Sequence, residues 1–84
     1  MVHYSGRVQR VGFRYTASSI ARYHRVTGWV LNLADGRVQM LVEGERKDVE
    51  ECLQAIRRYW GERIVDEDFD DREIEGFTEF EIRA

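Results

Sequence analysis

The stretch VHYSGRVQRVGFRYTASSIARYH, residues 2–24, decides the fold, because it changes from strand periodicity to helix periodicity. Apolar side chains alternate with more polar ones over residues 2–9, which predicts a first β-strand. After Gly12, apolar residues recur at helical spacing, which predicts an amphipathic helix from Phe13 to about His24. The sequence therefore predicts a strand that leads through a short loop into a helix.

The next segments indicate a β-hairpin followed by a second helix. Residues 27–33 are apolar and partly β-branched, Asp35-Gly36 is a strong turn signal, and residues 38–43 alternate again. Beyond Gly44 the apolar residues fall on one face of a helix, between an expected N-cap and a glycine stop. The apolar face comprises Val49, Cys52, Leu53, Ile56 and Trp60, the N-cap is Asp48 and the stop is Gly61.

Two further strands are expected after the second helix. Residues 64–73 form a poor, heavily acidic strand with Val65 and Phe69 facing inward, and residues 78–83 alternate as a last strand. The order is β-α-β-β-α-β, with room for one extra terminal strand. Because crossovers are right-handed, this order predicts an α+β fold, the ferredoxin-like split β-α-β sandwich (βαββαβ). In it, two helices pack on one antiparallel sheet, and we expect a single domain over residues 1–84.

Length and composition exclude several classes of protein. The 84 residues are enough for one small core, and 43% apolar with 35% charged residues indicates a globular chain rather than a disordered one. No apolar run approaches the ~20 residues of a membrane span, and the first residues lack the pattern of a secretory signal. The single cysteine excludes an internal disulfide and a cysteine zinc site. We therefore expect a soluble, cytoplasmic protein that uses no metal.

Charge is distributed unevenly along the chain. Residues 1–34 contain five arginines and no Asp or Glu, whereas residues 35–84 contain eight basic and all sixteen acidic residues. The two parts carry +5 and −8, for a net charge of −3. The acid-free part indicates a local site for an anion, although pairing of its arginines with distant acids explains it equally well. The overall acidity argues against broad nucleic-acid binding.

The loop before the first helix is where an anion is expected to bind. The first backbone N–H groups of a helix lack helical partners, and the helix dipole favours negative charge there. Arg14 lies at the start of this helix and can donate two parallel hydrogen bonds to a phosphate. By itself, a strand, a loop and a helix with one arginine fit a purely structural role equally well.

Two short motifs resemble the signatures of the acylphosphatase family. Residues 6–15, GRVQRVGFRY, are similar to the first signature, Gly-x-Val-Gln-Gly-Val-x-Phe-Arg. Residues 28–32, GWVLN, followed by DGRV at residues 35–38, are similar to the second. The resemblance continues through VEG at residues 42–44 to the C-terminal residues 76–82, so it covers essentially the whole chain.

This resemblance implies hydrolysis of an acyl phosphate to a carboxylate and inorganic phosphate, which is then both product and inhibitor. It implies that Arg14 binds the phosphate with the loop amides and that Asn32 holds the attacking water. The loop positions that match are Gln9, Arg10, Val11, Gly12 and Phe13. No metal, cofactor, nucleic acid or membrane is implied, a monomer is expected, and the identity of the acyl group is left open.

One position departs from the family's pattern, because Arg10 stands where the signature has glycine. If the loop needs a positive φ there, a non-glycine residue costs on the order of 1 kcal/mol. Alternatively, Arg10 adds a second cation beside the phosphate. We favour a working loop with altered kinetics. The alternative is a non-catalytic acylphosphatase-like module that binds phosphate or a partner.

Several other features are interpreted as structural. Asp66, Asp68 and Asp70 imitate the start of a calcium loop, but the position that needs glycine is Asp71. His3 and His24 have no obvious catalytic partner in the sequence. Four aromatic residues and the cysteine are expected in or beside the core rather than in a ligand site. They are Tyr4, Tyr15, Trp29, Trp60 and Cys52.

Overall fold

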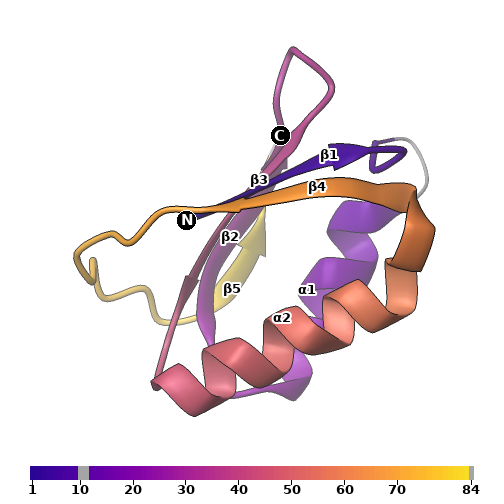
Figure 1. The fold of residues 1–84 in the computed structure, drawn as a ribbon. Helices are drawn as coiled ribbons and strands as arrows, with labels where there is room; N and C mark the ends of the chain where they lie inside the picture. Colours follow the sequence, from indigo (N-terminus) through magenta and orange to yellow (C-terminus); the bar gives the residue numbers. More distant parts are fainter. Residues whose placement is uncertain (10–11, 84) are drawn as a thin grey trace.

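The computed structural model, which describes residues 1–9 and 12–83, folds into two helices on one face of a five-stranded sheet (Figure 1). This confirms the predicted α+β, ferredoxin-like architecture. In chain order the elements are β1 (Val2–Gly6), α1 (Phe13–Tyr23), β2 (Thr27–Asn32), β3 (Val38–Glu43), α2 (Arg46–Trp60), a short 3-10 turn η1 (Gly61–Arg63), β4 (Ile64–Phe69) and β5 (Phe80–Ile82).

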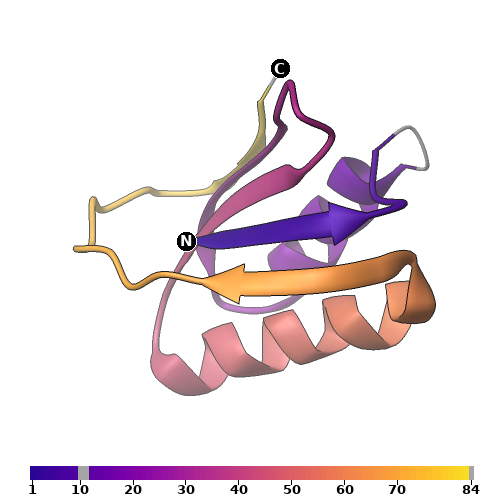
Figure 2. The same ribbon diagram turned by 45° about the horizontal axis from the view of Figure 1, so that its top comes forward.

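The strand order in the sheet is β4-β1-β3-β2-β5. The pairs β1–β3, β1–β4 and β2–β3 are antiparallel, as expected, but β5 runs parallel to β2. The sheet is therefore mixed rather than wholly antiparallel. The reason is that β4 ends at the end of the sheet where β2 begins, and the chain passes around that end to the opposite edge, so β5 starts beside the start of β2 and runs in the same direction (Figure 2).

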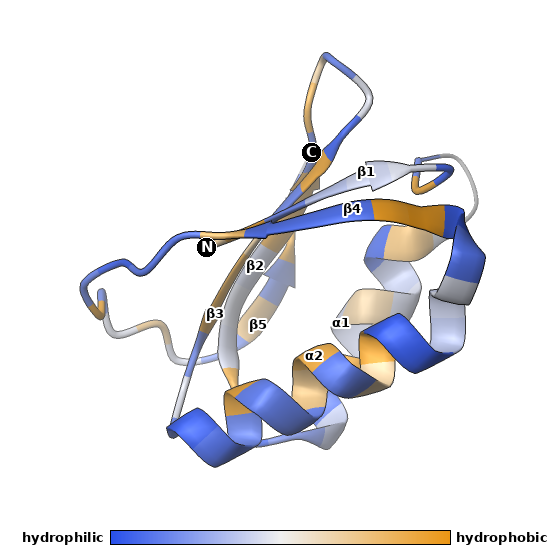
Figure 3. Cartoon of the chain, viewed as in Figure 1, coloured by the Kyte–Doolittle hydropathy of each residue, from blue (hydrophilic) through white to orange (hydrophobic). Residues whose placement is uncertain are grey.

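The core lies between the helices and the sheet. Figure 3 shows that the apolar stripe of α2 faces the sheet while its charged face points outward. At the centre of this core, the Phe13 ring lies 5.2 Å from the Tyr4 ring and 5.1 Å from the Trp60 ring. Tyr4 and Phe13 are fully buried. Because Phe13 is the first residue of α1, its burial determines where the helix begins and where the preceding loop ends.

The boundaries of α2 agree with the sequence at one end and differ at the other. Gly61 follows the helix with a φ of 52°, as expected for its stop, and Cys52 is buried on the inner face. The N-cap is Glu45, whereas Asp48, expected in that role, lies within the first turn. A carboxylate in the first turn still stabilises the positive end of the helix dipole.

Strand β4 differs from the expected inward pattern. Val65 is 78% exposed, because the pairing with β1 shifts register beside Gly6 and breaks the alternation; the neighbouring Ile64 packs on the core instead. Phe69 is 52% exposed because β4 is an edge strand, and the Arg57 guanidinium lies 5.8 Å from its ring centre. Val65 is therefore exposed and does not face inward as expected, whereas Phe69 does lie on the helix side of the sheet, beside α2, but is only half-buried.

Candidate active site

The loop after β1 leads into the N-terminus of α1. Gly6 leaves the strand with a φ of 120°, at a point where a Cβ would collide with the Arg63 main-chain oxygen. Gly12 enters α1 with a φ of 79°, and the first helical hydrogen bond runs from the Thr16 N–H to the Gly12 carbonyl at 3.0 Å. Among the described residues no side chain caps this end, and the first turn of α1 contains no acidic residue. The helix start is therefore suited to an anion.

A cavity of about 270 Å³ lies at this helix start. Buried Val8 and Phe13 form its apolar wall, and Tyr15, 71% exposed, lies at its rim rather than in or beside the core, where the sequence placed it. The cavity thus joins the α1 N-terminus to the end of β2. The lining residues are Val8, Gly12, Phe13, Arg14, Tyr15 and Asn32.

Arg14 is oriented by a residue far along the chain. Its Nη1 donates a hydrogen bond of 2.9 Å to the main-chain carbonyl of Arg83. That carbonyl is held because the Arg83 N–H bonds the Val30 carbonyl at 2.8 Å. A guanidinium has five N–H donors in a rigid fork, so several remain for an anion in the cavity. Sequence reasoning missed Arg83, since no local pattern links residues 69 positions apart.

Asn32 is the last residue of β2, and it lines the cavity. Its backbone is fixed in the sheet opposite Val38. Its side-chain Oδ1 is buried and has no hydrogen-bond partner among the residues that the structure describes. Leaving a buried amide oxygen without a partner costs about 1–3 kcal/mol. The position is therefore suited to a small ligand that donates a hydrogen bond.

Gln9 connects the loop to the hairpin that follows β2. Its Nε2 donates hydrogen bonds to the main-chain carbonyls of Leu33 at 2.8 Å and Arg37 at 2.9 Å. Gln9 is not among the residues that line the cavity, so its amide group secures the hairpin beside Asn32. The other two loop residues singled out in the sequence, Arg10 and Val11, lie outside the described residues.

The electrostatic character of the cavity is positive. Its described lining contains an arginine and the α1 N-terminus but no carboxylate and no imidazole. Asp35, on the adjacent hairpin, accepts hydrogen bonds from the Arg37 backbone N–H at 3.0 Å and its Nε at 2.9 Å. These bonds hold the pKa of the Asp35 carboxyl below its usual value. The acid nearest in sequence to Asn32 is thus engaged elsewhere.

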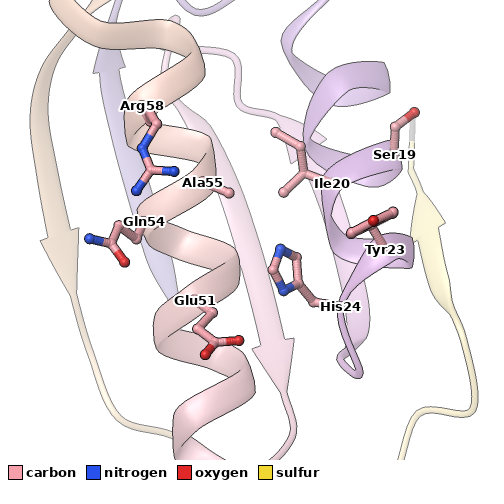
Figure 4. A pocket seen from close by; sticks show the side chains of 8 residues that line it. All are labelled: Ser19, Ile20, Tyr23, His24, Glu51, Gln54, Ala55 and Arg58. Carbon is pink, nitrogen blue, oxygen red and sulfur yellow. The ribbon is translucent and has the colours of Figure 1, made fainter.

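A larger groove, of about 540 Å³, lies between the two helices (Figure 4). Ile20 and Ala55 point toward one another across it, and His24 and Arg58 lie along its sides. It contains none of the residues singled out for phosphate binding or catalysis, so it is not the candidate site.

Across residues 1–9 and 12–83, no group of three or more His, Cys, Asp or Glu side chains is placed to hold a metal ion. The two helices of that part of the chain are too short or too polar to cross a membrane.

Comparison with known proteins finds similarity along nearly the whole chain. The family model described as Acylphosphatase matches residues 1–82. The chain is 47% identical to the acylphosphatase of Bacillus velezensis over 53 residues, which span 63% of this chain and 59% of that relative. It is 41% identical to the acylphosphatase of Trichormus variabilis over 83 residues, spanning 98% and 82% of the two chains. The crystal structure of acylphosphatase from Bacillus subtilis superposes with a TM-score of 0.89 at 33% identity, covering 99% and 94%.

Proposed function

Because the chain belongs to the acylphosphatase family, we propose that it hydrolyses acyl phosphates to a carboxylate and inorganic phosphate. The observation that carries the proposal is the shared cavity, which Arg14, the α1 N-terminus and Asn32 line together. One part of this cavity suits an anion and the other suits a water molecule. The reaction needs both side by side.

The substrate phosphate binds at the start of α1 in this proposal. Arg14 donates through the N–H groups that the Arg83 carbonyl leaves unused, and the amides of Gly12 and Phe13 contribute at the helix start. By family resemblance, the amides of Arg10 and Val11 belong to the same loop. These donors stabilise the charge that spreads over the phosphoryl oxygens in the transition state.

Asn32 positions the attacking water. Its side-chain oxygen or its NH₂ group forms a hydrogen bond with the water, whose oxygen attacks phosphorus while the bond from phosphorus to the acyl oxygen breaks. The carboxylate is a good leaving group, so no protein acid is needed to protonate it. No carboxylate or imidazole lines the described cavity, and the proton of the water therefore passes to a phosphoryl oxygen of the substrate. The protein supplies positioning and charge rather than a covalent step.

A second candidate function rests on Arg10, the arginine in place of the signature glycine. In this alternative the chain is a non-catalytic module that binds phosphate or a partner through the same loop. The two candidates differ in turnover and not in phosphate binding. The enzyme is further proposed to be a metal-independent monomer of the cytoplasm.

The test is hydrolysis of benzoyl phosphate in EDTA, with and without inorganic phosphate. The proposal expects turnover that survives the chelator and is inhibited competitively by phosphate. Asn32→Ala should lower kcat by about 10²-fold while the inhibition constant for phosphate changes little. Arg14→Ala should weaken both turnover and phosphate binding, and kcat/KM should fall by about 10³-fold.

A matched control is Gln54→Ala, which truncates an amide in the groove between the helices. It should leave kcat and phosphate inhibition unchanged. If Asn32→Ala turns over as fast as the parent, the role of Asn32 is wrong. If the parent binds phosphate without hydrolysing the substrate, the binding module replaces the enzyme.

A further inference from the structure

The segment between β4 and β5, residues 70–79, must cross the sheet from one edge to the other, and we call it the strap. β4 and β5 are the two outer strands, and β3 is the central one. Figures 1 and 2 show the strap passing around the end of the sheet without regular structure before it reaches β5. Glu43, the last residue of β3, lies where the strap passes that central strand.

The Glu43 carboxylate binds three successive backbone amides of the strap. Its Oε2 accepts a hydrogen bond from the Glu75 N–H at 2.6 Å, and its Oε1 accepts from the Gly76 and Phe77 N–H groups at 3.0 and 3.3 Å. Glu43 is 8% exposed. Hydrogen bonds to an ionised acceptor are shorter and stronger than neutral ones. These amides hold the pKa of the Glu43 carboxyl below its usual value.

A continuous set of contacts leads from the hydrogen bonds of Glu43 to the candidate site. At the end of the strap, the Gly28 N–H bonds the Glu79 carbonyl at 3.0 Å, and the next residue, Phe80, is buried beside β2. The Phe77 ring lies 5.5 Å from the Arg83 guanidinium. Arg83 in turn presents its carbonyl to Arg14. Strand β5 has three residues and a single neighbour in the sheet, and it is held further by its buried Phe80 side chain and by Arg22 of α1, whose Nη2 donates to the Phe80 carbonyl at 3.3 Å. The contacts of the strap add to these.

We propose that Glu43 is a positioning residue for Arg14, acting through the strap, β5 and the Arg83 carbonyl. The inference rests on the proposed role of Arg14 in binding phosphate. Without the carboxylate, the strap loses its anchor to the central strand, and β5 moves relative to β2. The guanidinium then loses the fixed acceptor that orients it, and phosphate binding weakens.

The decisive variant is Glu43→Gln, which keeps the size of the side chain but places an NH₂ group against backbone N–H donors. Glu79→Gln is the matched control, since it makes the same chemical change in the strap at an exposed side chain. Amide hydrogen exchange reports on β5 directly. In Glu43→Gln the Arg83 amide, which donates to the Val30 carbonyl of β2, should exchange about tenfold faster relative to the amides of β3, with no such change in the control.

Phosphate titration, followed by the NMR signal of the Arg14 Nε–H, reports on the site. Glu43→Gln should weaken phosphate binding about tenfold and shift this signal in the free protein. Glu43→Asp keeps the charge, so its phosphate affinity and its Arg14 signal should both lie closer to those of the parent. In an Arg14→Ala background, Glu43→Gln should change benzoyl phosphate kcat/KM by less than about twofold. A merely structural role would lower kcat/KM equally in both backgrounds.

Three results would overturn the inference: unchanged exchange in β5, unchanged phosphate affinity despite faster exchange, or additive effects with Arg14→Ala. If Glu43→Gln does not fold, the same measurements are made on Glu43→Asp, for which smaller changes in exchange rate and phosphate affinity are expected. A parent protein that neither binds phosphate nor turns over would refute the proposed function alone. The exchange rates and the Arg14 signal would still decide whether Glu43 orients Arg14.

Discussion

Replacing Gln9 by alanine removes both hydrogen bonds that join the loop to the hairpin. Each hairpin carbonyl keeps a backbone donor, since the Gly36 N–H bonds the Leu33 carbonyl at 3.2 Å and the Leu33 N–H bonds the Arg37 carbonyl at 2.8 Å. Neither oxygen is therefore left without a partner. The cost is the net value of two hydrogen bonds, which is about 1–3 kcal/mol at 0.5–1.5 kcal/mol each.

Urea unfolding of Gln9→Ala beside the parent measures this loss as a lower midpoint at an unchanged slope. The hairpin follows Asn32 directly, so a loosened hairpin should also lower kcat for benzoyl phosphate by about tenfold. Phosphate inhibition should change less, because Arg14 and the α1 N-terminus stay in place. Gln54→Ala serves as the control for truncation of an amide side chain.

The reasoning is tested most severely by Gln9→Glu. This variant keeps the shape of the side chain but turns carboxylate oxygens toward the Leu33 and Arg37 carbonyls. An acceptor facing two acceptors is repulsive, so at pH 7 the variant should be less stable than Gln9→Ala. A Gln9→Glu protein as stable as the parent would refute the assignment of Gln9 as the tie between loop and hairpin.

Four further changes have defined outcomes. Gly28→Ala places a Cβ against the Leu41 main-chain oxygen at a φ of 139°, so urea unfolding should show a loss of more than about 2 kcal/mol. Ile56→Ala leaves a cavity in the core and should cost about 3 kcal/mol in the same assay. Burial raises the pKa of the Cys52 thiol from 9.0 to about 11, so the folded state keeps a proton that the unfolded state loses between these values. Stability should therefore fall as pH rises through this range, and the urea midpoint of Cys52→Ala should fall less steeply. Arg10→Gly removes a cation from the phosphate loop and should raise the inhibition constant for phosphate several-fold, while identical kcat and KM would contradict both interpretations of Arg10.

Features with a local signal could be predicted from the sequence. The helices appear as 3.6-residue periodicity, and Phe13 and Gly61 mark the start of α1 and the end of α2 as expected. Residues 35 and 36 form the expected turn between β2 and β3. The cavity brings Arg14 and Asn32 together, as the family resemblance implied, although their roles remain predictions.

Features that depend on distant parts of the chain could not be predicted. An alternating pattern does not show whether its strand pairs parallel or antiparallel, so the direction of β5 was missed. The exposure of Tyr15 follows from its place at the cavity rim, and that of Val65 from a shift in pairing register. The link from Arg14 to Arg83 likewise exists only once the sheet has formed.

The hydrogen bond from Arg14 to the Arg83 carbonyl has a consequence for the synthesis of the protein on the ribosome. The carbonyl that orients Arg14 lies 69 residues further along the chain, so it is synthesised long after the arginine. A nascent chain that already contains both signature motifs still lacks the partner of its arginine. The site can therefore be completed only after residue 83 has left the exit tunnel, and its assembly coincides with closure of the sheet by β5. Because such non-local pairings form slowly, the appearance of phosphate binding should follow the last step of folding.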